Sequence, residues 1–338
     1  RQQMTNLNSM IPLLDVRGLT IDIDGRNGPA TVVDGIDLHV NRGETLGVVG
    51  ESGCGKSLTM LSLMRLLPNK IKVTQGTAVF DGRDLQTMSN RELRKVRGGD
   101  IGFVFQDPMT SLNPVMRIGE QICEPLRYHS GMNKHEAKTR TIELLRLVGI
   151  PGPEQRLQAY PHELSGGMRQ RVMIAIGLAC NPKLLIADEP TTALDVTIQA
   201  QIVDLVKDLR TKLGMSIVWI THDLALIAGL ADRVVVLYAG TVVEDAPVDT
   251  LYSKPLHPYT QGLLASIPQI GHAATTRLSS IGGTPPEPGR RPAGCPFAPR
   301  CPQAMAICRE RVPRLEYANE TDGHRVACFA AQTAKEAA

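Results

Sequence analysis

Residues 50–57 read Gly50-Glu51-Ser52-Gly53-Cys54-Gly55-Lys56-Ser57, which is the pattern G-x-x-x-x-G-K-[ST]. Glycines allow successive backbone N–H groups to turn inward around an anion. In such a loop the lysine reaches the outer phosphates of a nucleotide, and the serine hydroxyl binds Mg²⁺. The stretch therefore predicts a nucleotide-binding site in which Lys56 and Ser57 have these two roles.

The segments on either side of this loop indicate a strand before it and a helix after it. Residues 45–49, Thr-Leu-Gly-Val-Val, are apolar and rich in β-branched side chains, as in a buried strand. Leucines recur at helical spacing from Lys56 to Leu67, and Pro68 then ends the pattern. The dipole of a helix that begins at the loop favours bound phosphate. The alternative, a glycine turn that matches the pattern by chance, does not account for this context.

The composition indicates two domains and no membrane span. The chain has 338 residues, of which 42% are hydrophobic, and its net charge of +3 is too small to predict nucleic-acid binding. Its longest apolar or glycine run, residues 172–180, is far shorter than the roughly 20 residues of a membrane-spanning helix. Residues 1–10 are polar and lack the apolar region of a secretion signal. We therefore expect a reducing compartment, in which the seven cysteines favour metal binding over disulfides.

The apolar runs predict an α/β core that is interrupted by a helical insertion. Residues 13–23 and 31–40 form an expected antiparallel strand pair, and helical patterns at 118–128, 134–148 and 166–179 occupy the region of about 107–180. Further strands are expected at 77–80, 101–105, 184–187, 216–220, 233–238 and 241–244, with a long helix at 196–213. We expect a tail at 1–12, a nucleotide-binding domain at 13–255, and a small proline- and cysteine-rich domain at 256–338.

Two carboxylates, Asp188 and Glu189, directly follow the apolar strand pattern at 184–187. A carboxylate at the end of such a strand can hold Mg²⁺, and a second one beside it can activate the attacking water. We therefore assign Asp188 to Mg²⁺ and Glu189 to the water. The alternative is an acidic turn exposed to solvent, and the phosphate loop upstream makes that alternative the weaker one.

A serine and two glycines, Ser165, Gly166 and Gly167, begin the helical pattern at 166–179. A serine at this position caps the helix, but two glycines in the first turn reduce helix stability. The glycines are accounted for if the backbone must approach an anion closely. Residues 164–170, Leu-Ser-Gly-Gly-Met-Arg-Gln, thus predict a second contact with phosphate.

With these motifs, the chain resembles the ATP-binding-cassette family over about residues 13–245. Residues 165–170 resemble its signature motif, and Asp188-Glu189 resembles the end of its Walker B motif. Gln106 resembles the Q-loop glutamine, residues 193–195 (Ala-Leu-Asp) the D-loop, and His222 the switch histidine. The six motifs occur in the family order. The resemblance implies a P-loop NTPase cassette with an antiparallel β subdomain and a helical subdomain.

The resemblance also implies a mechanism. Two nucleotide-binding subunits pair head to tail, and each ATP lies between the phosphate loop of one subunit and the signature motif of the other. The implied catalytic residues are Glu189, which activates water; His222, which contacts the γ-phosphate and positions that water; and Gln106, which senses Mg²⁺ and links the site to a membrane partner. The implied Mg²⁺ ligands are Ser57, Gln106 and Asp188. The implied ATP contacts are Gly50, Glu51, Ser52, Gly53, Cys54, Gly55, Lys56, Ser57, Leu58, Ser165, Gly166, Gly167, Gln170 and Asp195.

Two positions depart from the family pattern. The family usually has an aromatic residue that stacks on adenine near the end of the first strand, where this chain has Ile23. The family often has threonine after the loop serine, where this chain has Leu58. We therefore expect apolar packing against the base and one fewer hydroxyl contact to phosphate.

Two further stretches resemble the ATPase subunits of dipeptide and oligopeptide importers. They are residues 256–264, Leu-His-Pro-Tyr-Thr-Gln-Gly-Leu-Leu, and residues 106–114, Gln-Asp-Pro-Met-Thr-Ser-Leu-Asn-Pro. The resemblance implies an ATP-hydrolysing subunit at the cytoplasmic face of a bacterial inner membrane, coupled to peptide uptake. Its implied partners are a second ATP-binding subunit, which is a different chain in many such importers, two transmembrane permease subunits and an extracytoplasmic peptide-binding protein. No nucleic-acid partner is expected.

Other substrates and other classes of cassette protein are alternatives. The same group includes nickel and glutathione importers, whose substrate selection lies in other subunits. Residues 256–264 disfavour an exporter. A soluble cassette protein that acts on ribosomes or DNA is more distant, since such proteins usually carry two cassettes or a long coiled coil. This chain shows one cassette, no sustained heptads and no basic patch.

Four cysteines, Cys295, Cys301, Cys308 and Cys328, lie near the C-terminus. Their spacing lacks the C-x₂₋₄-C knuckle that is usual in zinc sites, whereas four thiolates can hold an iron–sulfur cluster. The peptide-importer resemblance implies a 4Fe–4S cluster at these positions, and a zinc ion or metal-free thiols are alternatives. We favour a structural role for the cluster over a redox role. We expect ATP binding at Lys56 not to depend on it, because the cassette has its own core.

Overall fold

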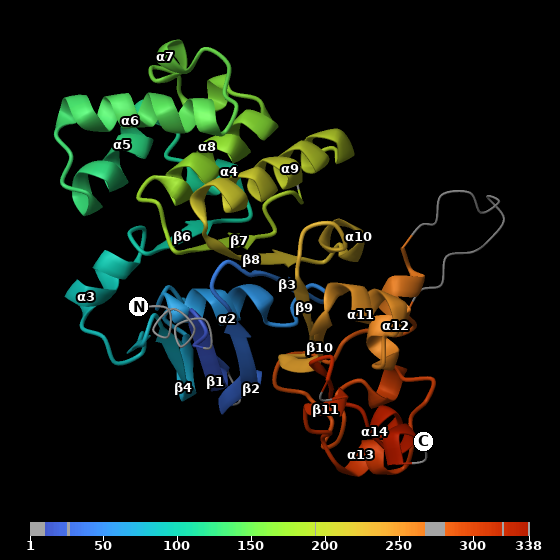
Figure 1. Cartoon of the computed structure of the whole chain (residues 1–338). Coiled ribbons are helices and arrows are strands. Elements are labelled where there is room, and N and C mark those ends of the chain that lie inside the picture. Colours follow the sequence, from blue (N-terminus) through green and yellow to red (C-terminus); the bar gives the residue numbers. More distant parts are fainter. Residues whose placement is uncertain (1–10, 26–27, 193, 268–280, 320, 337–338) are drawn as a thin grey trace, which may run out of the picture. The chain divides into compact units, whose positions relative to one another are not determined.

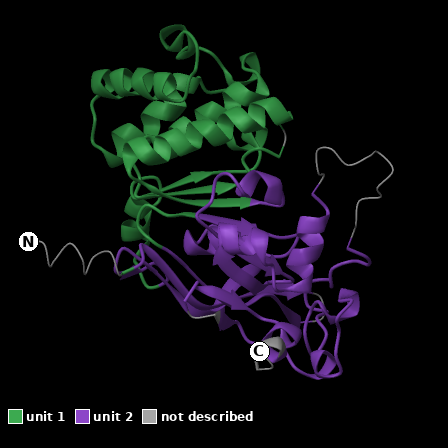
Figure 2. Cartoon of the chain, turned by 45° about the vertical axis from the view of Figure 1, so that its right-hand side comes forward, with its two compact units in different colours: residues 1–11, 41–45, 87–220 green, residues 12–40, 46–86, 221–338 purple. Residues whose placement is uncertain are grey.

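Two units make up the chain, and Figure 2 shows each in its own colour. Unit 1 contains residues 1–11, 41–45 and 87–220, and unit 2 contains residues 12–40, 46–86 and 221–338. The structure is a computed structural model, and it describes residues 11–25, 28–192, 194–267, 281–319 and 321–336. Most of the expected N-terminal tail, residues 1–12, therefore lies outside the described residues.

Unit 2 begins with a four-stranded antiparallel sheet in the order β2-β1-β4-β5. Its strands are β1 (Leu14–Gly25), β2 (Gly28–Val40), β4 (Ile71–Phe80) and β5 (Arg83–Asp84). The pairing of β1 with β2 confirms the antiparallel pair predicted from sequence. β4 is longer than the predicted 77–80, because residues 71–73 also pair with β1. All side chains of that added part are partly or fully exposed, and only Ile71 and Val73 in it are apolar, which is too short an alternation to mark a strand in the sequence.

The remaining strands of unit 2 lie in the order β11-β12-β10-β9-β3. β3 (Thr45–Val49) and β9 (Arg233–Tyr238) are parallel, whereas β10 (Thr241–Pro247), β12 (His324–Val326) and β11 (Glu316–Asn319) pair antiparallel in turn. Every residue of β3 is buried, as its apolar, β-branched sequence predicts. The helical segments of this unit are α2 (Lys56–Leu63), α10 (Leu224–Ile227), α11 (Val248–Ser253), α12 (Pro258–Ala265), η2 (Ala298–Arg300), α13 (Ile307–Glu310) and α14 (Phe329–Glu336).

Helix α2 ends four residues before the predicted Leu67, so that part of the prediction is wrong. Arg65 has a positive φ of 47°, which a continuing helix does not allow. The Leu66 N–H returns to the Leu61 carbonyl at 3.0 Å, in the manner of a C-terminal helix cap. The Arg65 guanidinium also donates to the Leu85 carbonyl at 2.8 Å. The leucine spacing alone could not reveal this turn.

Unit 1 combines three parallel strands with a group of helices. The strands lie in the order β8-β7-β6, with bounds Ser216–Thr221, Leu184–Asp188 and Ile101–Val104. Among the described residues between β6 and β7 there are helices and no strand, as the sequence predicts. Figure 1 shows α5, α6 and α8 gathered in this insertion. The helical segments are α3 (Asn90–Val96), α4 (Pro108–Ser111), α5 (Ile118–His129), α6 (Lys134–Leu147), α7 (Pro153–Arg156), η1 (Pro161–Glu163), α8 (Gly166–Leu178) and α9 (Val196–Leu213).

The C-terminal region joins the sheet of unit 2, because β12 pairs with β10. A fully buried carboxylate, Glu244 of β10, secures this junction. It accepts the backbone N–H groups of Leu256 and His257, at 2.7 and 3.1 Å, and it lies 2.7 Å from Nε2 of His324 on β12. A buried carboxylate must be hydrogen-bonded to be tolerated, and these three partners satisfy it. The strands β11 and β12 were missed from sequence because they are short and polar.

None of the helices in the described part of the chain is both long enough and apolar enough to cross a bilayer.

Candidate nucleotide-binding site

The phosphate loop lies between β3 and α2, as the sequence predicts. Gly55 is the N-cap of α2, and Lys56 is the first residue of the helix. The Lys56 side chain is only 4% exposed. Its ammonium group donates to the carbonyls of Gly50 and Glu51 at 2.7 and 3.0 Å. The loop thus curves around the amine that the phosphate-binding pattern requires.

Two glycines of this loop are in conformations that other residues cannot adopt there. Gly50 has φ 154°, and a Cβ at this position would lie 2.2 Å from the Leu237 carbonyl oxygen. Gly55 has φ 96°, and its Cβ would lie 2.9 Å from Cγ2 of Val33. The fold of the loop therefore requires both glycines of the pattern.

The turn between β9 and β10 is hydrogen-bonded to the phosphate loop. The Gly240 N–H donates to the Cys54 carbonyl at 3.0 Å, and the Asp34 N–H in turn donates to the Gly240 carbonyl at 2.8 Å. Burial raises the pKa of the Cys54 thiol, so this cysteine packs as a neutral side chain. Its position between the glycines is explained by packing.

The two predicted carboxylates lie at the end of β7. Asp188 is the last residue of the strand and is buried, while Glu189 has a positive φ of 44°. Such a conformation is unfavourable for a residue with a side chain, and it commonly occurs at functional sites. The Glu189 N–H donates to the Ile220 carbonyl at 3.0 Å, which holds the turn in place.

Two side chains donate to the same oxygen of the Glu189 carboxylate. Gln106 Nε2 lies 3.3 Å from Glu189 Oε2, and Thr192 Oγ1 lies 3.0 Å from it. The structure therefore brings together two residues that the sequence assigned to the reaction, 83 positions apart. Thr192 was missed. Its place three residues after the carboxylate that the sequence assigns to the attacking water is the only signal in the sequence that could have indicated it.

The signature residues begin α8, as predicted. Ser165 is the N-cap, and its hydroxyl accepts the Met168 N–H at 3.4 Å. A Cβ on Gly167 would lie 2.8 Å from Cγ2 of Ile198, whereas a Cβ on Gly166 would have only an ordinary contact at 3.6 Å. Packing against α9 therefore explains Gly167 but not Gly166. Ser165 and Gly166 are exposed, whereas Gln170 is buried.

The other predicted motif residues lie at the ends of elements. Asp195 caps α9, accepting the Ile198 N–H at 2.9 Å, and Ala193 lies outside the described residues. His222 directly follows β8 and is exposed to solvent. Ile23 is half-buried near the end of β1, and Leu58 lies in the first turn of α2.

The four C-terminal cysteines line a single small cavity. It is enclosed by Cys295, Cys301, Cys308 and Cys328 together with side chains that include His257 and Phe297. All seven cysteines are free thiols. Burial raises the pKa of Cys295 to about 11, and the neighbouring Cys308 and Cys328 raise it as well. Within the described ranges, no three or more His, Cys, Asp or Glu side chains are grouped so that they could hold one metal ion.

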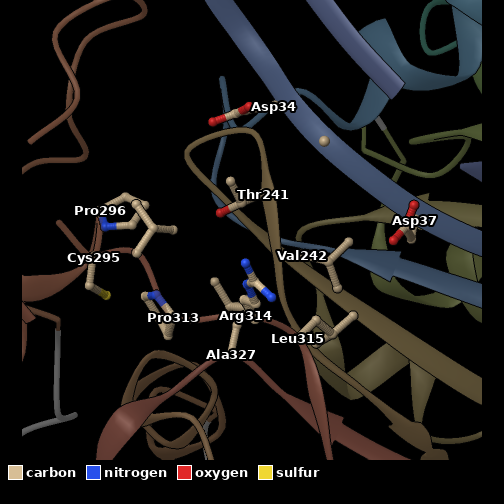
Figure 3. A pocket seen from close by; sticks show the side chains of 13 residues that line it. Asp34, Asp37, Thr241, Val242, Cys295, Pro296, Pro313, Arg314, Leu315 and Ala327 are labelled. Atoms are coloured by element: carbon tan, nitrogen blue, oxygen red, sulfur yellow. The ribbon is translucent and has the colours of Figure 1, made fainter. Parts of the chain in front are cut away.

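A larger hollow of about 420 Å³ lies on another side of Cys295 (Figure 3). Asp34, Asp37 and Arg314 are among its lining residues, together with apolar side chains from β10 and the segment 312–315. It contains no residue of the phosphate loop. It is therefore separate from the predicted nucleotide site.

Comparison with known proteins agrees with these features. The family described as "ABC transporter" matches residues 33–192, and the family "Oligopeptide/dipeptide transporter, C-terminal region" matches residues 243–308. The chain is 52% identical to the oligopeptide transport ATP-binding protein AppD of Bacillus subtilis, over 95% of this chain and 97% of that protein. It is 50% identical to the dipeptide transport ATP-binding protein DppD of Haemophilus influenzae, over 90% and 92% of the two chains.

A solved structure with a similar fold is a dimeric ATP-binding cassette in a post-hydrolysis state with ADP and Pi. It has a TM-score of 0.63 and 30% sequence identity, and the match covers 70% of this chain and 98% of that chain. Together with the phosphate loop, the carboxylates of β7 and the capped start of α8, these matches are decisive. The chain belongs to the ATPase subunits of the oligopeptide and dipeptide ABC importer family.

Proposed function

We propose that this chain hydrolyses ATP by attack of a water molecule that Glu189 activates. The observation that best supports this role is the pair of donors, Gln106 and Thr192, on one oxygen of the Glu189 carboxylate. A general base must be held in a fixed orientation before it can take a proton from water, and these donors restrain it. The unfavourable φ of Glu189 is consistent with a residue held for function. His222 would contact the γ-phosphate and position the same water.

The residues of the phosphate loop suit a magnesium nucleotide. Ser57, Gln106 and Asp188 would hold Mg²⁺, since hydroxyl, amide and carboxylate oxygens are the ligands that this ion takes. The bound ion would screen the phosphate charges. Lys56 would bind the outer phosphates, and the N–H groups of residues 50–58 would surround them. The glycine conformations at Gly50 and Gly55 support such a cradle.

We propose that the complete site forms between two ATPase subunits. The exposed start of α8, with Ser165 and Gly166, carries N–H groups that can bind a phosphate of the ATP held by the partner subunit. Packing explains Gly167, but no contact among the described residues explains Gly166, which supports a ligand role for this end. Gln170, which is buried in the same motif, and Asp195, which caps α9, would also contribute to ATP binding.

Double substitutions test this arrangement in the assembled transporter. Lys56→Ala in this chain, combined with a change of the partner subunit's signature serine, should damage one ATP site only. Lys56→Ala combined with Ser165→Ala in this chain should damage both sites and abolish turnover. Equal residual ATPase activity in the two assemblies would contradict the composite site. Full ATPase activity of the isolated chain at high dilution would also contradict the composite site.

The family supports coupling of this hydrolysis to peptide uptake. We propose that the chain binds two transmembrane permease subunits at the cytoplasmic face of the inner membrane. A second ATP-binding subunit would pair with it, and an extracytoplasmic peptide-binding protein would deliver the substrate. Relatives named for oligopeptide and dipeptide transport, at 52% and 50% identity, support a peptide. A nickel importer or a glutathione importer is the alternative. The three substrates are distinguished by testing which of them, peptide, nickel or glutathione, stimulates the ATPase activity of the transporter when its binding protein delivers it.

We also propose the domain boundaries that the sequence suggests. The nucleotide-binding domain would cover residues 13–255, with its helical subdomain at about 107–180, and the peptide-importer region would cover residues 256–338. The two family matches, at 33–192 and 243–308, support a division of this kind. The second match begins within β10, which suggests that the importer-specific part extends into the shared sheet.

We propose that the four C-terminal cysteines hold a 4Fe–4S cluster with a structural role. All four cysteines line one cavity, which supports a shared ligand, but the cavity measures only about 10 Å³, about the space of one water molecule, so the segment must expand to admit a cluster. In such a cluster each thiolate binds a different iron, so the sulfurs need not converge as closely as around one ion. A single zinc ion requires close tetrahedral convergence, and no such group occurs among the described residues.

Metal analysis of anaerobically purified protein tests the cluster. We expect brown protein with about four iron atoms per chain. Cys301→Ser should lose the iron, while Cys123→Ser, which changes a buried thiol in unit 1, should retain it. If the protein contains one zinc atom and no iron, the four cysteines form a zinc site instead of a cluster site. If the wild type and both variants contain no metal, the cysteines hold neither a cluster nor zinc.

A further inference from the structure

A residue of the cysteine-rich segment pairs with a residue of the phosphate loop. Arg300 is the last residue of η2 and directly precedes Cys301. Its guanidinium donates to both oxygens of the Glu51 carboxylate, with Nη1 2.7 Å from Oε2 and Nη2 2.9 Å from Oε1. The Arg300 side chain is only 5% exposed. Such two-point pairing fixes geometry and is stronger than a neutral hydrogen bond.

A second residue of the C-terminal region binds the backbone of the same loop residue. The Glu51 N–H donates to the hydroxyl of Tyr259 on α12 at 2.8 Å. Tyr259 is fully buried, and its ring packs against Tyr238 and Phe297 with centroids 4.7 and 5.4 Å apart. Burial raises the pKa of Tyr259, so the hydroxyl stays protonated. This acceptor is therefore held in place by an aromatic cluster.

Arg300 is itself restrained on several sides. It donates to the Gly282 carbonyl at 2.8 Å and to the Tyr238 hydroxyl at 3.3 Å. Its guanidinium also lies over the Tyr238 and Phe297 rings. A side chain that is held this firmly can in turn restrain its partner, because little conformational freedom remains to be lost.

The residue that Arg300 and Tyr259 contact, Glu51, is itself in contact with the lysine of the phosphate loop. The Glu51 carbonyl accepts the Lys56 ammonium, so a shift of Glu51 moves a partner of the phosphate-binding lysine. The Glu51 carboxylate is also an anion next to a site for anions. Arg300 neutralises it, and without Arg300 an uncompensated, partly buried negative charge would oppose phosphate.

We propose that Arg300 and Tyr259 are positioning residues of the phosphate loop, so that the C-terminal region sets the affinity for ATP. The inference rests on the proposed binding of ATP at residues 50–58. It also argues against the expectation from sequence that ATP binding is independent of the cysteine segment. The phosphate loop shares hydrogen bonds and a salt bridge with that region.

Equilibrium binding of MgATP to the purified full chain, together with its melting temperature, tests the proposal. Arg300→Gln should weaken MgATP binding about ten- to hundredfold, the range expected for loss of a charge-assisted pair. Arg300→Lys keeps the positive charge but loses the two-point geometry, so its affinity for MgATP should lie between those of the wild type and Arg300→Gln. Tyr259→Phe removes only the hydroxyl and should weaken binding several-fold. Arg290→Gln is the matched control, since Arg290 is an exposed arginine of the same region, paired with Glu287.

The double variant Glu51→Gln, Arg300→Gln separates neutralisation of the Glu51 charge by Arg300 from mere support of the fold. Removing the carboxylate as well should restore most of the lost affinity, because the uncompensated charge is gone. A structural role alone would give no such recovery. Wild-type affinity in folded Arg300→Gln would overturn the proposal while leaving ATP binding intact. A wild-type chain that fails to bind MgATP would instead overturn the proposed function and this inference together.

Discussion

Gln106 Nε2 donates to Glu189 Oε2 across 3.3 Å, joining a residue that follows β6 to the residue that follows β7. The parallel pairing of these strands places their carboxyl ends at one edge of the sheet, where functional residues commonly gather. The contact gives Gln106 a physical route to the Glu189 carboxylate. A displacement of Gln106 by a bound partner would alter the orientation of Glu189.

Thr192→Val tests the second donor on Glu189. The change keeps the shape of the side chain but removes the hydroxyl that lies 3.0 Å from the carboxylate. We expect turnover to fall about ten- to hundredfold with unchanged MgATP affinity, because a hydrogen bond to a charged group contributes roughly 1.5–3 kcal/mol. Thr211→Val in α9 is the control, since that exposed hydroxyl donates to the Lys207 carbonyl of its own helix. Equal kcat values for wild type and Thr192→Val would remove Thr192 from the site.

The two signature glycines should respond differently to alanine. Gly167→Ala places a methyl group 2.8 Å from Ile198, so we expect a loss of about 1–3 kcal/mol of stability from overpacking. Gly166→Ala meets only an ordinary contact at 3.6 Å and should leave the melting temperature unchanged or raise it. If the backbone there approaches phosphate, Gly166→Ala should nevertheless lower ATPase activity of the assembled transporter. Full activity in this variant would show that Gly166 has no contact with ATP.

His257 should make stability depend on pH. Burial lowers the pKa of His257 to about 4, while the nearby Glu244 opposes that shift. Between about pH 6.5 and 4, the unfolded chain binds a proton that the folded chain does not, so stability falls as pH falls. The slope contributed is about 1.4 kcal/mol per pH unit. Urea unfolding across this range measures it.

His257→Asn is the variant that isolates this term. An asparagine oxygen can still accept the Tyr259 N–H that His257 Nδ1 accepts at 3.1 Å, so the start of α12 keeps its cap. The variant should show a flatter dependence of stability on pH in this window. His135→Asn changes an exposed histidine and should keep the wild-type slope. If both variants retain that slope, burial of His257 is not its source.

Local patterns in the sequence were enough to predict the cassette, because its motifs are contiguous. The run from Thr45 to Ser57 specifies a buried strand, a phosphate loop and a helix start within a few residues, and all three occur. Helix α9 and strand β9 also have the predicted bounds, since their apolar periodicity is regular. The peptide-importer family was likewise predicted correctly from residues 106–114 and 256–264.

Contacts between distant residues could not be predicted in this way. Arg300 and Glu51 are 249 positions apart, and nothing near either residue identifies its partner. The turn at Arg65 depends on carbonyls of residues 85 and 86, which lie on a different segment. The cysteine segment also packs against residues that are distant in sequence. The rings of Tyr238 and Tyr259, from outside that segment, pack against Phe297 within it.

The most direct test of the central claim is ATP hydrolysis by the transporter assembled with its permeases and peptide-binding protein. The wild-type assembly should hydrolyse ATP faster when the binding protein carries a peptide. Glu189→Gln should bind MgATP normally but lose turnover by about 10²–10⁴-fold, the contribution of one general base. Glu143→Gln, which changes an exposed glutamate of α6, should behave as wild type. Near wild-type, peptide-stimulated turnover in Glu189→Gln would contradict the account.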